Sequence, residues 1–179
     1  MIKKLAMSGF VCIACACCNV HARAQSTPSS LSSLQFLTGE WAGGGSTAAG
    51  QATGRSSITS DLGGHVLVRR DHTDIPAANG RPASTIDILM LIYPQASDGK
   101  LHATYTDSEG HVIQYTAQQV APDHMVEFDS AVSPNSPTFR LTYTLLKPAE
   151  LEVKFEMAMP GKNAVFRSIA VGTLRRSNK

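Results

Sequence analysis

The chain has 179 residues, with 16 Lys and Arg against 14 Asp and Glu and a formal net charge of +2. This length suits one domain. The near balance of charge and the lack of a basic stripe argue against a nucleic-acid partner. The one long apolar run, residues 5–18, is too short to cross a bilayer as a mature helix, so no stable membrane span is expected.

Residues 1–24 have the character of a cleaved signal peptide. Two lysines precede the apolar run and an Ala-Arg-Ala sequence ends at residue 24, so we expect cleavage before Gln25 and a periplasmic or secreted protein. A lipid anchor on a leader cysteine is the alternative. All four cysteines lie in this leader, which leaves a mature chain of 155 residues (179 − 24) without disulfides. Three basic residues also leave with the leader, so 13 remain against 14 acidic ones.

The mature chain begins with a lead-in and a short helical plug. Residues 25–33 are rich in Ser, Thr and Pro and are predicted to be flexible. Leucines at i, i+3 spacing over 31–37 predict one or two helical turns. Gly39 and Trp41 then open the first strand, in which the glycines at 43–45 permit sharp bending.

The remainder predicts an all-β domain over residues 34–179. Short strands separated by turn signals are expected at 51–61, 65–75, 84–93, 100–107, 111–120, 124–132, 139–147, 151–159 and 165–175. With the first strand this makes about ten, in up-and-down order. An antiparallel barrel is preferred because closure removes unpaired edges, and a β-sandwich is the alternative. The most apolar strand, 84–93, is expected to be covered on both faces.

Three stretches resemble a known type of barrel. They are Phe36-Leu37-x-Gly39-x-Trp41, the Asp-Ser-Glu-Gly-His-Val-Ile sequence at 107–113 and the Phe-Arg-Leu-Thr-Tyr sequence at 139–143. They resemble the bacterial domain of unknown function 1579 family, a lipocalin-like (calycin) β-barrel. The resemblance implies that an arginine ending the last strand, Arg175, packs on Trp41. It brings no assigned activity.

The opening motif is also similar to that of the haem-binding nitrobindin barrels. Those barrels carry a histidine on the last strand as the iron ligand. This sequence has no histidine after His124. No haem, and no other cofactor, is therefore expected.

His72 and Asp87 are the first candidate pair. If the hairpin turns at Asn79-Gly80, these two residues face each other, and a carboxylate opposite a histidine raises the histidine pKa. They are read as a polar anchor inside a ligand cavity, or alternatively as a structural pair. Arg70 shares the face of His72 and is expected at the mouth of the cavity, with a solvated strand end as the alternative.

Other polar residues are candidates for the barrel interior. Tyr105 and Tyr143 combine an apolar body with a hydroxyl, which suits a partly polar pocket. Arg140 is predicted to join them, with a surface salt bridge to Glu156 as the alternative. In the polar stretch 107–111, Gly110 predicts a tight hairpin turn rather than a metal site, and no metal is expected.

Three functional hypotheses follow, in order of preference. The first is an exported barrel that binds a small, largely apolar ligand in its interior. The second is a structural or interaction protein whose barrel is filled by side chains. The third is an enzyme that uses His72 and Asp87 as an acid–base pair.

Overall fold

The computed structural model describes residues 30–48, 50–78, 80–161 and 164–177. The predicted signal peptide and most of the predicted lead-in lie outside these residues. The described part contains two short 3-10 helices and ten strands. In chain order they are η1 (Leu31–Leu37), β1 (Gly39–Thr47), β2 (Gly50–Asp61), η2 (Leu62–Gly64), β3 (Val66–Ile75), β4 (Ser84–Gln95), β5 (Lys100–Asp107), β6 (Val112–Ala121), β7 (Met125–Ser130), β8 (Thr138–Lys147), β9 (Glu150–Ala158) and β10 (Arg167–Arg176).

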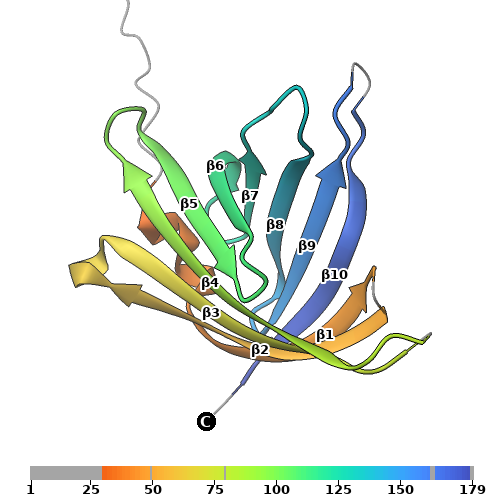
Figure 1. Cartoon of the computed structure of the whole chain (residues 1–179). Coiled ribbons are helices and arrows are strands. Elements are labelled where there is room, and N and C mark those ends of the chain that lie inside the picture. Colours follow the sequence, from red (N-terminus) through yellow and green to blue (C-terminus); the bar gives the residue numbers. More distant parts are fainter. Residues whose placement is uncertain (1–29, 49, 79, 162–163, 178–179) are drawn as a thin grey trace, which may run out of the picture.

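The strands form a closed antiparallel barrel. Each strand pairs with its neighbours in the chain, and β1 pairs with β10 to close the sheet (Figure 1). The predicted up-and-down barrel is confirmed and the sandwich alternative is wrong. A glycine is needed at the closing seam, because a Cβ on Gly45 would lie 1.9 Å from the Val171 carbonyl oxygen on β10.

The helix η1 closes one end of the barrel. It begins at Leu31, so the structured chain starts inside the predicted lead-in. Leu34 and Leu37 of η1 are fully buried in the apolar core. The backbone carbonyl of Ser33 accepts a hydrogen bond of 3.0 Å from Asp123 in the β6–β7 turn. We call this the closed end, and the opposite end, where β5 turns into β6 and β7 into β8, the open end.

The predicted tryptophan–arginine contact exists, but Arg176 makes it. The Arg176 guanidinium lies 4.3 Å from the centroid of the Trp41 ring. Gly39 has a φ of 131°, and a Cβ there would lie 2.3 Å from Arg176 Nη1. Arg175 points the other way, with an 80% exposed side chain 3.8 Å from Glu150. Adjacent side chains of a strand face opposite sides, which explains the error of one residue.

Alternation along the strands separates an inner from an outer surface. The inner positions of β3 are Leu67, Arg69 and Asp71, while Arg70 and His72 face outward. The prediction that the apolar strand β4 is covered on both faces is wrong, because outward-facing Leu91 is 37% exposed. No helix in the described part of the chain is long and apolar enough to cross a membrane.

Candidate functional site

The barrel interior is filled at the closed end. Ten of its side chains there have no solvent exposure; they are Leu34, Leu37, Leu67, Met90, Ile92, Leu101, Ala103, Val126, Phe128 and Leu151. Three others that face inward near this end, Val120, Leu145 and Leu174, are partly buried. The closed end therefore matches the second functional hypothesis, in which side chains fill the barrel.

Toward the open end, inward-facing side chains remain partly exposed. Tyr105 and Ile113 from β5 and β6, and Phe139, Val153 and Phe155 from β8 and β9, pack on the core but keep part of their surface in solvent. The rings of Phe139 and Phe155 are stacked, with centroids 5.6 Å apart. Since these residues face inward, solvent reaches the interior here. We call these five residues the inner wall.

A buried ion pair lies beside the inner wall. Arg69 Nε donates to Asp71 Oδ1 at 3.0 Å, and its Nη2 contacts Asp71 Oδ2. Its Nη1 donates to the hydroxyl of Tyr143, across the barrel on β8, and approaches the sulfur of Met90 at 3.8 Å. Arg69 is only 7% exposed. The guanidinium is thus committed to protein partners on both sides of the barrel.

The protonation states of this cluster are fixed by burial and by the ion pair. Burial works against the charge of Arg69, but attraction to Asp71 and Tyr143 outweighs it and raises the Arg69 pKa above its usual range. Burial raises the pKa of Tyr143 to about 12, against the opposing attraction of Arg69. At neutral pH the site therefore presents a paired cation and a neutral phenol.

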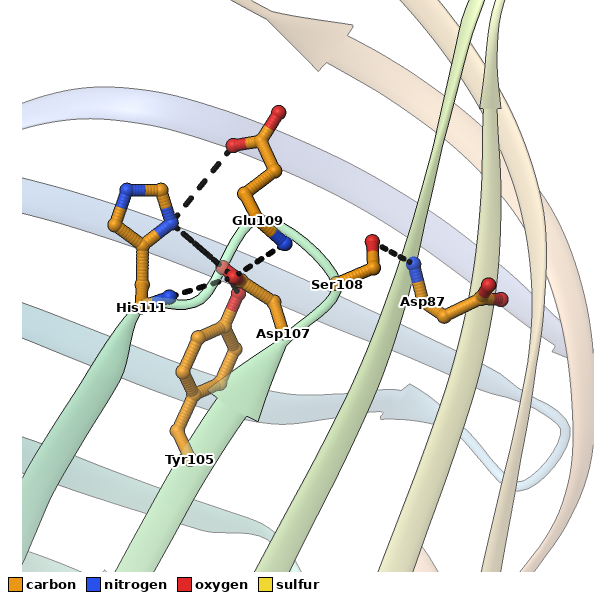
Figure 2. Close-up of polar contacts among 6 residues, drawn as sticks. All are labelled: Asp87, Tyr105, Asp107, Ser108, Glu109 and His111. Atoms are coloured by element: carbon orange, nitrogen blue, oxygen red, sulfur yellow. Dashed lines mark hydrogen bonds and ion pairs between the residues drawn. The ribbon is translucent and has the colours of Figure 1, made fainter.

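Tyr105 connects the interior to the β5–β6 turn. Figure 2 shows its ring extending toward Asp107, whose Oδ2 accepts a 2.9 Å hydrogen bond from the Tyr105 hydroxyl. Asp107 Oδ1 also accepts from the backbone N–H groups of Glu109 and His111, both at 3.0 Å. Burial works to raise the Asp107 pKa, but hydrogen bonds from His111 and Tyr105 outweigh it and lower the pKa. The φ of 87° at Gly110 completes the predicted tight turn.

Two buried hydroxyl groups of the described residues have no hydrogen-bond partner. They are Tyr115 Oη and Ser56 Oγ, on residues only 2% and 4% exposed. Tyr115 faces inward from β6 in the register row of Ala103 and Ser130. Burial raises its pKa, so the hydroxyl stays protonated. An unmet buried hydroxyl costs about 1–3 kcal/mol, which makes Tyr115 a notable feature of this interior.

His72 and Asp87 meet as predicted, but on the outer surface. They are partners in the β3–β4 register, and His72 Nδ1 lies 2.7 Å from Asp87 Oδ1. The side chains are 34% and 66% exposed. The hydrogen bond to Asp87 raises the pKa of His72. The pair therefore does not anchor a group inside the barrel.

Arg70 lies on the same outer surface. It is exposed, and it lines a shallow pocket of about 330 Å³ formed by the middle of β3 and β4 and the end of β5. Asp87 and Ser108 line this pocket too, and the Ser108 hydroxyl accepts a 3.1 Å hydrogen bond from the Asp87 backbone N–H (Figure 2). A second pocket of about 410 Å³ lies on β2, β3 and β4 near the β3–β4 turn.

Arg140 also faces outward, where its predicted partner Glu156 is its register neighbour on β9. Its ion pairs, however, run to Asp129 at 2.8 Å and to Glu127 at 3.3 Å. The Phe166 ring covers it at 4.1 Å. The surface alternative for Arg140 is the correct one. Tyr105 and Tyr143, by contrast, do face the interior.

Two more histidines, His111 at the β5–β6 turn and His102 beside the β4–β5 turn, are each paired with a carboxylate. His111 Nδ1 lies 3.0 Å from Asp107, and His102 Nε2 lies 2.8 Å from Asp98. Among the described residues, no three or more His, Cys, Asp or Glu side chains are grouped as metal ligands.

The residues that the sequence reading missed are Arg69 and Asp71. Each is next to a residue that was assigned to the cavity, and adjacent residues of a strand face opposite sides of the sheet. The pattern at 66–68 is apolar at both parities, so alternation alone could not decide which face of β3 is inside. The bulk of Leu67, fully buried, is the one signal that pointed to the other parity.

Comparison with known proteins adds little to this geometry. No family model and no curated protein matches the chain. Among solved structures, a protein with unknown function from the DUF3598 family of Nostoc punctiforme is similar to it. That chain is 10% identical, the match covers 83% of this chain and 99% of that one, and the TM-score is 0.32. Such a likeness carries no argument about function, and the resemblance to the domain of unknown function 1579 family stays a prediction.

Proposed function

We propose that this protein is an exported barrel of the domain of unknown function 1579 type that binds a small, largely apolar ligand inside its open end. The supporting observation is the inner wall, whose aromatic and aliphatic side chains face inward yet remain partly exposed. Covering such surface contributes roughly 25 cal/mol per Å² of apolar area removed from water. Apolar side chains that face inward and stay partly exposed therefore favour an apolar occupant.

The side chains of this site include stacked aromatic rings and tyrosines that are already held in place, and both suit ligand binding. Phe139 and Phe155 offer stacked rings for the apolar part of a ligand. Tyr143 and Tyr105 are held by Arg69 and Asp107 respectively, so they are already oriented before a ligand arrives. Preorganised side chains lower the entropic cost of binding.

The enzyme hypothesis has no comparable support. It needs the His72–Asp87 pair within a cavity beside a bound substrate. The two side chains lie instead on the outer surface, with Asp87 66% exposed. A solvent-exposed histidine–carboxylate pair is common in proteins and does not by itself indicate catalysis.

The binding proposal is tested by filling the open end with one side chain. Ala170 and Val171 are adjacent on β10, and both are partly exposed. Ala170 lies in register with inward-facing Phe155, and Val171 with outward-facing Lys154. Ala170→Trp therefore occupies the interior, and Val171→Trp adds the same bulk outside as a matched control.

The assay is fluorescence titration with the neutral probe N-phenyl-1-naphthylamine, with circular dichroism to confirm folding. We expect the wild type and Val171→Trp to bind the probe equally, and Ala170→Trp to bind it at least ~10-fold more weakly, a loss of about 1.4 kcal/mol. Equal affinity in all three proteins, or no binding by the wild type, would refute the proposal.

A further inference from the structure

We infer that the ligand carries one carboxylate, which Arg167 binds at the rim of the open end while the apolar part of the ligand lies against the inner wall. This inference rests on the proposed binding function and assigns the chemical class of the ligand. It follows from the position of Arg167 in the barrel and from the charged groups that the described residues place around it.

Arg167 faces inward beside the inner wall. It is the first residue of β10 and lies in register with Met157 on β9, which in turn lies in register with Phe139. Residues directly opposite on antiparallel strands share a face, with Cβ atoms about 4.5–5.5 Å apart. The ring of Phe166, the preceding residue, covers Arg140 on the outer surface, which agrees with an inward direction for Arg167. The Arg167 side chain therefore stands at the rim of the open end, next to the exposed aromatic surface.

The positive charge of Arg167 is not neutralised by the described part of the chain. Its side chain is exposed, and no ion pair or hydrogen bond joins it to another described residue. Glu156, the acidic residue on the neighbouring strand, faces outward and pairs with Lys154 at 2.7 Å. Arg69, the other cation that faces inward near the inner wall, is already paired with Asp71. Arg167 is thus the cation of this rim that is free to bind a ligand group.

The acidic groups of the interior do not compete for Arg167. The described acidic strand residues that face inward at the open end are Asp71 and Asp107. Both oxygens of Asp71 contact Arg69, and Asp107 accepts hydrogen bonds from the Tyr105 hydroxyl and from two backbone N–H groups. Asp107 also belongs to β5, which is five strands away from β10 in the ring of ten, on the opposite wall. A ligand anion at Arg167 therefore meets attraction on its own side of the barrel.

The charge balance of the open end suits a single negative charge on the ligand. The four inward-facing charged groups named above, two arginines and two aspartates, sum to zero, so they exert no net repulsion on an anion. A guanidinium binds a carboxylate through two parallel hydrogen bonds. One unpaired arginine balances one carboxylate, whereas a phosphate dianion would keep an uncompensated charge. With the stacked rings of Phe139 and Phe155 beside this rim, the ligand is an apolar molecule that ends in a carboxylate.

The test compares decanoate with 1-decanol, which has the same chain length and no charge, by displacement of N-phenyl-1-naphthylamine at neutral pH and low salt. The proteins are the full chain, Arg167→Met and the matched control Arg175→Met, with circular dichroism to confirm folding. Arg175 lies on the same strand but points outward with an 80% exposed side chain, so both variants lose one positive charge. We expect Arg167→Met to bind decanoate ~3- to 10-fold more weakly, as befits an ion pair partly in solvent, and to bind decanol as the wild type does. Arg175→Met should bind both probes like the wild type.

Each outcome decides a different point. Decanoate affinity that is equal in Arg167→Met and in the wild type, or that falls as much in Arg175→Met, would overturn the role of Arg167. An equal loss of decanol and decanoate in Arg167→Met would overturn it too, because that loss would come from packing and not from charge. A wild type that binds the naphthylamine but not decanoate would overturn the assigned ligand class and leave the binding function standing. A wild type that binds no probe, including the naphthylamine, would refute the binding function itself.

Discussion

Removing the charge of Asp71 should strongly destabilise the barrel. Asp71 holds the guanidinium of Arg69, which is only 7% exposed, with Nε and Oδ1 3.0 Å apart. At an effective dielectric constant of 20, unit charges about 4 Å apart attract by about 4 kcal/mol. Deleting one partner of a buried pair costs about 3–5 kcal/mol, because the other charge stays buried without compensation. We therefore expect Asp71→Asn to lower the free energy of unfolding by about 3–4 kcal/mol.

The assay is urea unfolding followed by circular dichroism at neutral pH. With a slope of about 2 kcal/mol per molar urea, the midpoint should fall by about 1.5–2 M. Asp74→Asn is the matched control, because Asp74 lies on the same strand with a side chain 59% exposed, and it should change stability by less than ~0.5 kcal/mol.

A double variant separates charge from packing. Replacing both partners by apolar residues, as in Arg69→Met with Asp71→Val, removes both buried charges and should recover most of the stability lost in Asp71→Asn. A loss of unfolding free energy below ~1 kcal/mol in Asp71→Asn, or an equal loss in Asp74→Asn, would contradict the prediction. It would show that the buried charge of Arg69 does not depend on Asp71.

Three further predictions concern the contact of Gly39 with Arg176, the outer pair of His72 and Asp87, and Asp107 at the β5–β6 turn. Gly39→Ala should destabilise by more than ~1 kcal/mol in the same urea assay, because φ is 131° and Arg176 occupies the Cβ position. NMR titration should give His72 a pKa above 6.5, and Asp87→Asn should lower that pKa. Because the pKa of His72 is raised in the folded state, the pair stabilises the fold below pH 6.5. This contribution disappears as the pH rises through the folded-state pKa. Asp107 has a lowered pKa, so it stabilises above pH 3.8 and loses this effect on acidification; Asp107→Asn should flatten the acid limb of a stability–pH curve.

Much of the fold could be predicted from the sequence. Turn residues and two-residue alternation placed the strands to within a few residues, and the pairing of His72 with Asp87 followed from the position of one hairpin turn. Both are local signals, set by backbone conformation and by the period of a strand.

The face of each strand was harder to predict than its limits. In β3 the residues Val66, Leu67 and Val68 are all buried, so apolar character did not mark the inner side. The choice depends on how β2 and β4 pair with β3 and on where η1 sits, which are tertiary facts. The contact with Trp41 was predicted for Arg175 but is made by Arg176, and the cause is the same: the face of the strand was assigned one residue off.

The unpaired hydroxyl of Tyr115 could not be predicted at all. Tyrosine at this position reads equally well as a core residue, a pocket residue or a partner of a polar group. Only the side chains that surround it in the closed barrel show that its ring is packed while its oxygen has no partner.

The binding claim is tested most directly by native mass spectrometry of the full chain, produced with its N-terminal segment in an exporting host. Wild type and Val171→Trp are predicted to retain a small molecule, and Ala170→Trp to carry none, since its indole fills the open end beside Phe155. A bare polypeptide mass for the wild type, or the same bound mass in Ala170→Trp, would contradict the account.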